Sequence, residues 1–216
     1  PIHSSAASDV YKRQVFKLHT LRIDLNSINK TYLWKIKIKK ETKLGKNLTL
    51  TGMMGVGKST IGKILAKKLD YNFIDVDKLI EKKENSSINL IFKNNGESYF
   101  RKIESEITLA VLKKDNSVIS LGGGAFINNL IRKNVKKLSI SFWLDSPINQ
   151  LVKRLKKNKK RPLLFRKNID ETVKKIYFER KKIYNEADYR IKCNSLKSGE
   201  IVNKILGIYE NSGNKV

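Results

Sequence analysis

Eight residues in the first third of the chain have the spacing of a phosphate-binding loop. Residues 52–59 read Gly-Met-Met-Gly-Val-Gly-Lys-Ser and fit the pattern G-x-x-x-x-G-K-[ST]. Glycines let the backbone curl so that successive N–H groups face phosphate oxygens at the positive end of a helix dipole. Lysine in this pattern bridges the β- and γ-phosphates, and the hydroxyl after it ligates Mg²⁺. The sequence therefore predicts a site for ATP and Mg²⁺, with nucleotide contacts from Gly55, Val56, Gly57, Lys58, Ser59 and Thr60.

The flanks of this loop favour a phosphate site over a plain turn that ends in a surface lysine. Residues 48–50 form a short apolar run that suits a buried parallel strand. Ile61, Ile64, Leu65 and Leu69 follow the loop at helical spacing. The order strand, glycine loop, helix is the context that the motif requires.

Two carboxylates and three glycines follow further predicted strands. Asp75 and Asp77 end a strand expected over residues 72–77, and three glycines at 122–124 follow one over residues 117–121. Ligands of open parallel sheets bind in the crevice at the carboxyl ends of the strands. One carboxylate could hold a Mg²⁺-bound water and the other an acceptor hydroxyl. The alternative is that the two acids only cap the next helix.

The elements that must position these residues alternate between strand and helix patterns. We expect strands over residues 48–50, 72–77, 117–121, 138–144 and 189–193, and helices over 61–69, 79–84, 88–92, 96–112, 145–157, 169–185 and 198–209. Asp145 is expected to cap the helix that Pro147 begins. The alternation predicts an α/β fold with three layers, a five-stranded parallel sheet with helices on both faces. The basic residues 158–167 are expected to be mobile.

Composition limits the class of protein and its partners. No apolar run is long enough to span a bilayer. The single cysteine, Cys193, excludes a disulfide framework, and we expect it to be a buried small residue. The net charge of +26 suggests nucleic-acid binding, but the lysines fall mostly on outer helix faces, without the interleaved aromatics of RNA-binding surfaces. We expect no specific nucleic acid and no membrane as partners, and weak, salt-sensitive adhesion to polyanions.

Residues 1–46 differ from the rest of the chain. The first 14 are small, polar and patternless and resemble translated sequencing-adapter read-through, and a basic run follows at residues 35–40. Upstream non-coding sequence and a targeting presequence are the alternatives for residues 15–46. We expect a non-native or disordered basic leader over residues 1–46 and the functional domain over 47–216. Both histidines, His3 and His19, lie in this leader, so any general base of the domain must be another residue type.

Six motifs in this order resemble those of the shikimate kinase family, which belongs to the nucleoside-monophosphate-kinase group of phosphate-loop folds. They are GMMGVGKST at 52–60, FIDVD at 73–77, FRKIE at 100–104, LGGG at 121–124, RPLL at 161–164 and ERKKIY at 179–184. The resemblance covers residues 46–209, which is essentially the chain without its leader. It implies a P-loop kinase fold with a mobile lid at about residues 158–168, a monomer, and a cytoplasmic location.

The resemblance also implies a reaction, the ATP-dependent phosphorylation of the 3-hydroxyl of shikimate. Asp75 would hold Mg²⁺ through water, beside the Ser59 hydroxyl. Asp77 would bind ring hydroxyls and is the candidate base for the 3-hydroxyl. Lys58 and Arg161, the latter in the lid, would neutralise charge on the transferring phosphoryl group.

Further substrate and nucleotide contacts are implied in the same way. Arg101 and Arg180 would grip the shikimate carboxylate, since a small anion is held best by planar bidentate cations. Gly122, Gly123 and Gly124 would pack backbone N–H groups against the ring, because glycine allows close ligand approach. Arg154 would stack on adenine.

Each of these assignments has a plainer alternative. Arg101 and Glu104 are three residues apart on a helix, so Glu104 either orients Arg101 or forms an ordinary surface ion pair with it. Arg154 lies among many lysines and could belong to a solvated face.

Rival functions are another small-molecule kinase of this fold, such as a gluconate or nucleoside-monophosphate kinase, an ATP-switched nucleic-acid-binding module, and a non-enzyme that keeps the fold. The combination of Asp77, Arg101 and Arg180 favours shikimate.

Overall fold

A computed structural model of the chain describes residues 46–156, 168–194 and 196–213. The chain divides after Lys43, and every described residue lies in the compact unit Leu44–Val216. Its strands are β1 (Asn47–Thr51), β2 (Asn72–Asp75), β3 (Ser117–Ser120), β4 (Ser139–Asp145) and β5 (Tyr189–Lys192). Its helices are α3 (Lys58–Leu69), α4 (Val76–Lys83), α5 (Ile88–Leu112), the 3-10 turn η1 (Ala125–Ile127), α6 (Asn129–Leu138), α7 (Ile148–Lys156), α8 (Ile169–Tyr184) and α9 (Ser198–Gly213).

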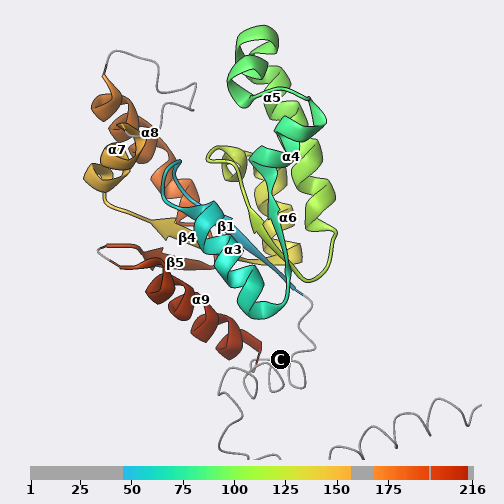
Figure 1. Cartoon of the computed structure of the whole chain (residues 1–216), viewed down its shortest axis with the longest axis vertical. Coiled ribbons are helices and arrows are strands. Elements are labelled where there is room, and N and C mark those ends of the chain that lie inside the picture. The colour runs from blue at the N-terminus through green and yellow to red at the C-terminus, as the bar shows by residue number, and fades with distance from the viewer. Residues whose placement is uncertain (1–45, 157–167, 195, 214–216) are drawn as a thin grey trace, which may run out of the picture. The chain divides into compact units, whose positions relative to one another are not determined.

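The five strands form one sheet in the order β2-β3-β1-β4-β5, and every neighbouring pair is parallel (Figure 1). The central strand β1 pairs with β3 on one side and β4 on the other. Because the strands are parallel, their carboxyl ends meet at one edge of the sheet, where the phosphate loop, Asp75 and the triple-glycine loop begin. The predicted fold class is confirmed.

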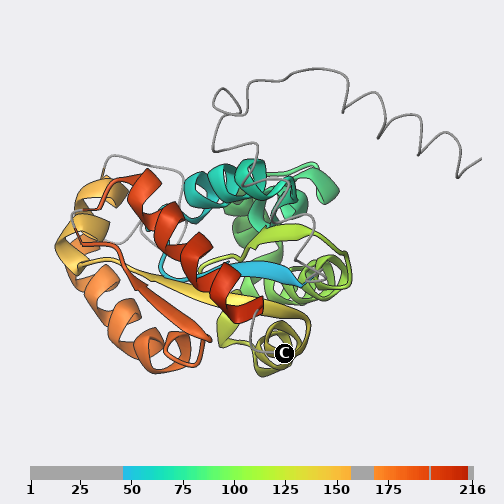
Figure 2. The ribbon, with the colours of Figure 1, turned by 90° about the horizontal axis from the view of Figure 1, so that it is seen from below.

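Helices cover both faces of this sheet, as Figure 2 shows in a view turned by 90°. Helices α3 and α9 lie side by side over one face, and α5 and α6 contact each other over the opposite face. Leu48 and Leu50 on β1 are fully buried, as are Val118 and Ile119 on β3. Apolar burial on both faces of central strands is the expected source of stability in such a sheet. Within the described residues, no helix combines the length and apolar character needed to cross a membrane.

Helix α6 was not predicted, although its apolar residues follow helical spacing. It reads Asn-Leu-Ile-Arg-Lys-Asn-Val-Lys-Lys-Leu, and Ile131, Val135 and Leu138 recur at i, i+4 and i+7. Leu138 was instead assigned to the following strand, which begins at Ser139. The helix start is set by Asn128, whose side chain accepts hydrogen bonds from the N–H groups of Leu130 and Ile131.

The predicted capping role of Asp145 is wrong. Helix α7 begins at Ile148, and the carbonyl of Pro147 accepts its first helical hydrogen bond, from Leu151 N–H. Asp145 is still part of β4, where it pairs with Lys192. Its carboxylate accepts hydrogen bonds from the Tyr177 hydroxyl at 3.0 Å and from Arg190 Nη2 at 2.6 Å. A buried carboxylate requires such partners, and here they are tertiary rather than local.

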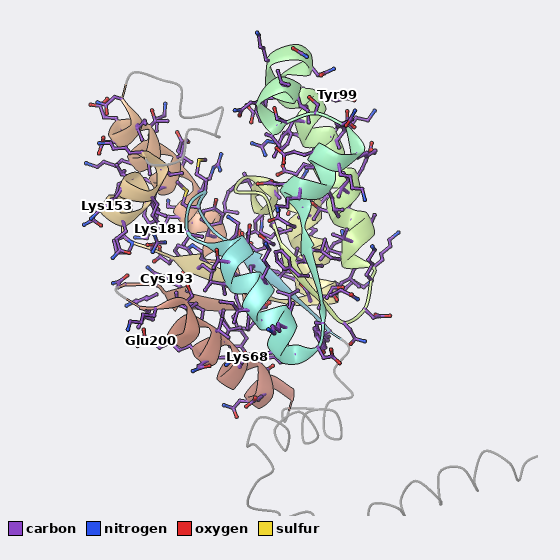
Figure 3. All side chains as sticks on the ribbon, viewed as in Figure 1. Lys68, Tyr99, Lys153, Lys181, Cys193 and Glu200 are labelled. Atoms are coloured by element: carbon purple, nitrogen blue, oxygen red, sulfur yellow. The ribbon has the colours of Figure 1, made fainter. Side chains whose placement is uncertain are left out.

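Two other expectations hold, the first of them in modified form. The helices predicted over residues 88–92 and 96–112 are joined as α5, but Gly96 lies between them with φ 82° and ψ 173°, outside the helical region. Cys193, which is labelled in Figure 3, is buried as expected, and 2% of its surface is exposed. Burial also raises the pKa of its thiol to about 11, so the thiol stays protonated and poorly nucleophilic.

Candidate active site

The phosphate loop connects β1 to α3 and leaves the first turn of the helix without a side-chain cap. Gly52, Gly55 and Gly57 have φ of +131°, +78° and +103°, which L side chains rarely adopt. The intervening Met53, Met54 and Val56 are buried and anchor the loop. Gly57 precedes the helix with no side-chain cap hydrogen bond. Backbone N–H groups at the start of α3 are therefore available to an anion.

Two cations contact carbonyls of this loop. Lys58, 8% exposed, donates from Nζ to the carbonyl oxygens of Gly52 at 2.9 Å and Met53 at 3.1 Å. Arg154 on α7 donates from Nη1 to Val56 O at 3.2 Å. Arg154 thus lies at the phosphate loop rather than on an unrelated solvated face.

Ser59 and Asp75 lie together beside the loop. The Ser59 hydroxyl donates to Asp75 Oδ2 at 2.6 Å, and Asp75 Oδ1 accepts from Lys78 N–H at 3.4 Å at the start of α4. Asp75 is therefore both a helix cap and a partner of the phosphate loop, so the two interpretations of this carboxylate are compatible. Among the described residues, no group of three or more His, Cys, Asp or Glu could hold a metal ion.

Asp77 lies in a helix and not at the end of a strand. Strand β2 stops at Asp75, and Asp77 is in the first turn of α4. A Cβ atom built on Gly122 would be 2.8 Å from Asp77 Oδ1, so the carboxylate still reaches the triple-glycine loop. The strand prediction was wrong because Asp75 caps a helix immediately. The expected proximity of Asp77 to the glycines is correct.

Arg101 and Glu104 form a partly buried ion pair on α5. Arg101 Nη1 donates to Glu104 Oε2 at 2.6 Å, and the side chain of Glu104 is only 2% exposed. Arg101 also donates to Glu97 Oε1 from Nε at 3.2 Å and from Nη2 at 3.0 Å. Burial raises the pKa of Glu104, and the Arg101 guanidinium partly offsets that rise. Because Glu104 is buried, the pair is not an ordinary surface ion pair, and Glu104 orients Arg101.

Residues 122–124 bring these groups together. A Cβ on Gly122 would overlap Glu104 Oε1, and a Cβ on Gly124 would be 2.6 Å from Arg101 Nη1. Gly123 approaches the phosphate loop, because its Cβ would be 3.4 Å from Met54 N. Among the described residues, the N–H groups of Gly123 and Gly124 donate to no protein acceptor. Glycine is therefore required here by the protein's own side chains, and the loop keeps N–H donors for a ligand.

Helix α8 reaches the same loop from the other side. Arg180 Nη1 donates to Gly123 O at 2.7 Å, and the fully buried Tyr184 donates its hydroxyl to the same carbonyl oxygen. Arg101 and Arg180 thus flank one glycine loop. Sequence reasoning missed Glu97 and Tyr184 as supporting residues. Tyr184 could have been identified from the sequence as the last residue of the ERKKIY motif. Glu97 has no sequence signal beyond its spacing of four residues from Arg101.

One predicted site residue is not located. Arg161 lies outside the described residues, as does the lid expected over about residues 158–168, except for Asn168, which caps α8. The remaining predicted residues lie at the carboxyl edge of the sheet, on the phosphate loop, the end of β2, the loop after β3, and helices α3, α4, α5, α7 and α8. This arrangement combines a glycine loop at a helix start, the paired oxygens of Ser59 and Asp75, and two guanidinium groups beside the triple-glycine loop.

Comparison with known proteins identifies the family. The family model described as "Shikimate kinase" matches residues 54–210. The chain belongs to the shikimate kinase family. Shikimate kinases of Persephonella marina and a Sulfurihydrogenibium species are 43% and 44% identical to it over 162 and 165 residues. These matches cover 75% and 74% of this chain, and 98% and 96% of the relatives.

Solved structures of shikimate kinases have the same fold. The enzyme of Acinetobacter baumannii, described in complex with shikimate, has a TM-score of 0.78 and 31% identity and covers 82% of this chain and 98% of its own. A gluconokinase of Sinorhizobium meliloti has a TM-score of 0.52, 13% identity, and coverage of 80% and 96%. At that identity the gluconokinase shows a shared fold and nothing about substrate. Membership of the shikimate kinase family rests on the closer matches.

Proposed function

We propose that this chain transfers the γ-phosphoryl group of ATP to the 3-hydroxyl of shikimate and releases ADP and shikimate 3-phosphate. The observation that carries this proposal is the position of Arg101 and Arg180 on the two sides of the triple-glycine loop, next to the phosphate loop. A small carboxylate bound between two guanidinium groups would place its ring over Gly123 and Gly124. The names of the relatives and the shikimate bound by the Acinetobacter baumannii structure support the same substrate.

Mg²⁺ fits the residues beside the phosphate loop. The Ser59 hydroxyl and the Asp75 carboxylate, 2.6 Å apart, are the hard oxygen groups that this ion prefers. Mg²⁺ in kinases is held by one or two carboxylates together with phosphates and waters, so no larger acidic cluster is needed. When bound, the ion neutralises charge on the β- and γ-phosphates.

The protein's own groups would contribute mainly position and charge. Lys58, already held at the loop, would bind the β- and γ-phosphate oxygens, and N–H groups at the start of α3 would bind the same polyphosphate. Asp77 would accept a hydrogen bond from the 3-hydroxyl and receive its proton late in the transfer. Arg161 would add a positive charge at the transferring group. Arg154 would stack on adenine.

A substrate panel tests the proposal directly. ADP release is measured in a coupled assay with ATP and either shikimate, gluconate or a set of nucleoside monophosphates. We expect turnover with shikimate and at most a trace with the others. Turnover of gluconate or a nucleoside monophosphate in place of shikimate would reject the proposal and favour the rival kinase of the same fold.

The carboxylate clamp has its own test. Arg101→Lys and Arg180→Lys keep the charge but lose the planar fork, so each should raise the KM for shikimate at least about tenfold while the KM for ATP changes little. Shikimate methyl ester, which lacks the anionic carboxylate, should be a poor substrate and much less sensitive to either change. Lys181→Arg, one residue beyond Arg180 on the exposed face of α8 (Figure 3), is the matched control. Equal discrimination between acid and ester by variants and wild type would rule out the clamp.

A further inference from the structure

The carbonyl oxygen of Gly123 is held by two donors from the same helix. Arg180 Nη1 donates to it at 2.7 Å, and the Tyr184 hydroxyl donates to it as well. Two donors use both lone pairs of a carbonyl oxygen. The Gly123 carbonyl is therefore committed to α8, and the triple-glycine loop presents its N–H groups rather than this oxygen to a ligand.

The environment of Tyr184 keeps its hydroxyl a donor. The residue has no exposed surface, and its ring lies 6.0 Å from the Trp143 ring on β4, measured between centroids. Burial is the largest influence on the pKa of Tyr184 and raises it, against the opposing effect of the Arg180 guanidinium. A neutral phenol hydroxyl can donate to a carbonyl, whereas a phenolate could not.

The loop needs such a restraint because three glycines do not hold a conformation by themselves. Glycine has more accessible backbone conformations than any other residue, so each peptide between residues 122 and 124 can rotate at low energetic cost. Rotation of the Gly123–Gly124 peptide would turn its N–H away from the site and remove the acceptor that Arg180 uses. A ligand would then have to order the loop and the guanidinium on binding, at a cost in affinity.

We propose that Tyr184 is a positioning residue for substrate binding, whose hydroxyl holds the Gly123 carbonyl and thereby fixes both the loop N–H groups and the Arg180 guanidinium. This proposal rests on the proposed function, because it concerns the affinity for shikimate. Tyr184 does not contact the reacting atoms in this account. It acts through Gly123 and Arg180.

Tyr177 provides a control on the same helix. It lies seven residues before Tyr184 and also donates its hydroxyl to a buried acceptor, Asp145 Oδ1 at 3.0 Å. Asp145 ends β4 and is also bonded to Arg190, so this contact fastens α8 without contacting the glycine loop. Tyr177→Phe and Tyr184→Phe therefore remove the same group from one helix, at positions that differ in their connection to the site.

The experiment compares the two variants with wild type in the full chain. Shikimate affinity is measured by isothermal titration calorimetry, and the KM values for shikimate and ATP by the coupled assay, at a temperature well below every melting midpoint. We expect Tyr184→Phe to raise the Kd and KM for shikimate about fivefold, with the KM for ATP within about twofold of wild type. Tyr177→Phe should lower the melting midpoint but leave both shikimate constants within about twofold.

A double variant adds a second measurement. Because Tyr184 and Arg180 share one acceptor, the combined effect of Tyr184→Phe and Arg180→Lys on the KM for shikimate should be smaller than the product of the single effects. Equal effects of Tyr177→Phe and Tyr184→Phe on shikimate affinity, or no effect of Tyr184→Phe, would overturn the positioning role while leaving the function intact. Failure of the wild-type chain to bind or phosphorylate shikimate would instead overturn the function on which it rests.

Discussion

At the scale of single residues, the absence of a side chain at Gly122 and Gly124 has a specific structural use. Space at Gly122 is taken by the carboxylates of Glu104 and Asp77, and space at Gly124 by the Arg101 guanidinium. Neither glycine has a positive φ, so an alanine would be opposed by contact with these side chains and not by backbone strain. The two glycines therefore leave room for the side chains of Glu104, Asp77 and Arg101 to lie directly against the loop.

Alanine substitutions should separate the two positions. Gly122→Ala would overlap the deeply buried Glu104, so it should cost about 1–3 kcal/mol of stability and most of the activity. Gly124→Ala pushes against the Arg101 guanidinium, whose side chain is 30% exposed, so a shift that keeps the bond to Glu104 should cost less stability than Gly122→Ala while the KM for shikimate rises at least about tenfold. Melting curves and steady-state kinetics measure both effects.

Gly207 is the control for these substitutions. It lies in α9, and a Cβ there would meet nothing within 4 Å. Gly207→Ala should leave activity unchanged and raise stability by up to about 1 kcal/mol, because alanine is the better helix former. Unchanged shikimate kinetics in Gly124→Ala would contradict the crowding at Arg101.

The Arg101–Glu104 pair predicts a dependence of stability on pH. Burial places the pKa of Glu104 above its usual 4.5, with Arg101 as the largest opposing influence. A carboxyl group with a raised folded-state pKa contributes stability below its unfolded pKa and loses that contribution as pH rises through the folded value. Arg101→Met removes the opposing charge and raises this pKa further. The variant should therefore lose more stability at about pH 8 than at about pH 5, by up to about 3 kcal/mol.

Denaturant unfolding of Arg101→Met at the two pH values measures this difference. Adding Glu104→Gln removes the buried charge, so the double variant should recover most of the loss at the higher pH and show a flatter pH profile. A loss that is the same at both pH values would mean that Arg101 stabilises α5 by packing alone.

At the scale of elements, α7 supports the phosphate loop. Arg154 Nη1 donates to the carbonyl of Val56 at 3.2 Å, and Leu155 Cδ2 would be 3.0 Å from a Cβ on Gly55. Arg154→Met keeps an unbranched apolar stem but loses the guanidinium, and with it the hydrogen bond and the proposed adenine contact. We expect the KM for ATP to rise about fivefold or more and the KM for shikimate to change little.

The adjacent Lys153→Met controls for loss of positive charge on α7. Lys153 is exposed and points away from the body of the protein (Figure 3). The Lys153→Met variant should therefore keep the KM for ATP within about twofold of wild type. If both variants raised the KM for ATP equally, the charge of α7 and not the Arg154 contact would be responsible.

The elements also show what the sequence can and cannot predict. The strand over residues 48–50 and the helix over 61–69 were predictable because a buried apolar run, a glycine loop and a helical stripe all indicate the same structure. Helix α6 was not predicted, because its last apolar residue, Leu138, was assigned to the strand that follows. Asp145 was misassigned because its partners, Tyr177 and Arg190, are 32 and 45 residues away in sequence. Local pattern carries no information about such tertiary partners.

The same limit applies to the candidate site. The family resemblance grouped Asp77, Arg101 and Arg180 around one substrate, and the structure brings all three to the glycine loop. The shared edge of parallel strands accounts for the glycine loop itself, whereas Arg101 and Arg180 lie on α5 and α8. The motifs do not show which side chains hold the site residues in position. Glu104 fills the space beside Gly122, and the Tyr184 hydroxyl donates to the Gly123 carbonyl. Both contacts depend on distances of a few tenths of an ångström that only packing determines.

At the scale of the whole molecule, the net charge is distributed unevenly along the chain. Residues 1–46 hold eleven Lys or Arg and three Asp or Glu, which leaves +18 of the total +26 on the remaining residues. The compact unit begins at Leu44 and holds every strand and helix described above. All site residues located by the structure belong to this unit.

Deletion of residues 1–43 should therefore leave folding and kinase activity largely intact. The truncated chain keeps the whole of β1, whose residues pair with both β3 and β4. We expect a melting midpoint within about 3 °C of the full chain, which corresponds to about 1 kcal/mol or less for a domain of this size. The kcat/KM for shikimate should stay within about twofold.

A second deletion, extended through Leu50, shows how sharp the boundary is. It removes nearly all of β1, together with the fully buried Leu48 and Leu50. Each buried leucine contributes roughly 2–3 kcal/mol, and the strand joins the two halves of the sheet, so this chain should not fold. Circular dichroism and the coupled assay distinguish the two deletions. A large loss of activity or melting temperature in the shorter deletion would mean that residues 1–43 are part of the working enzyme, and that the catalytic unit is larger than residues 44–216.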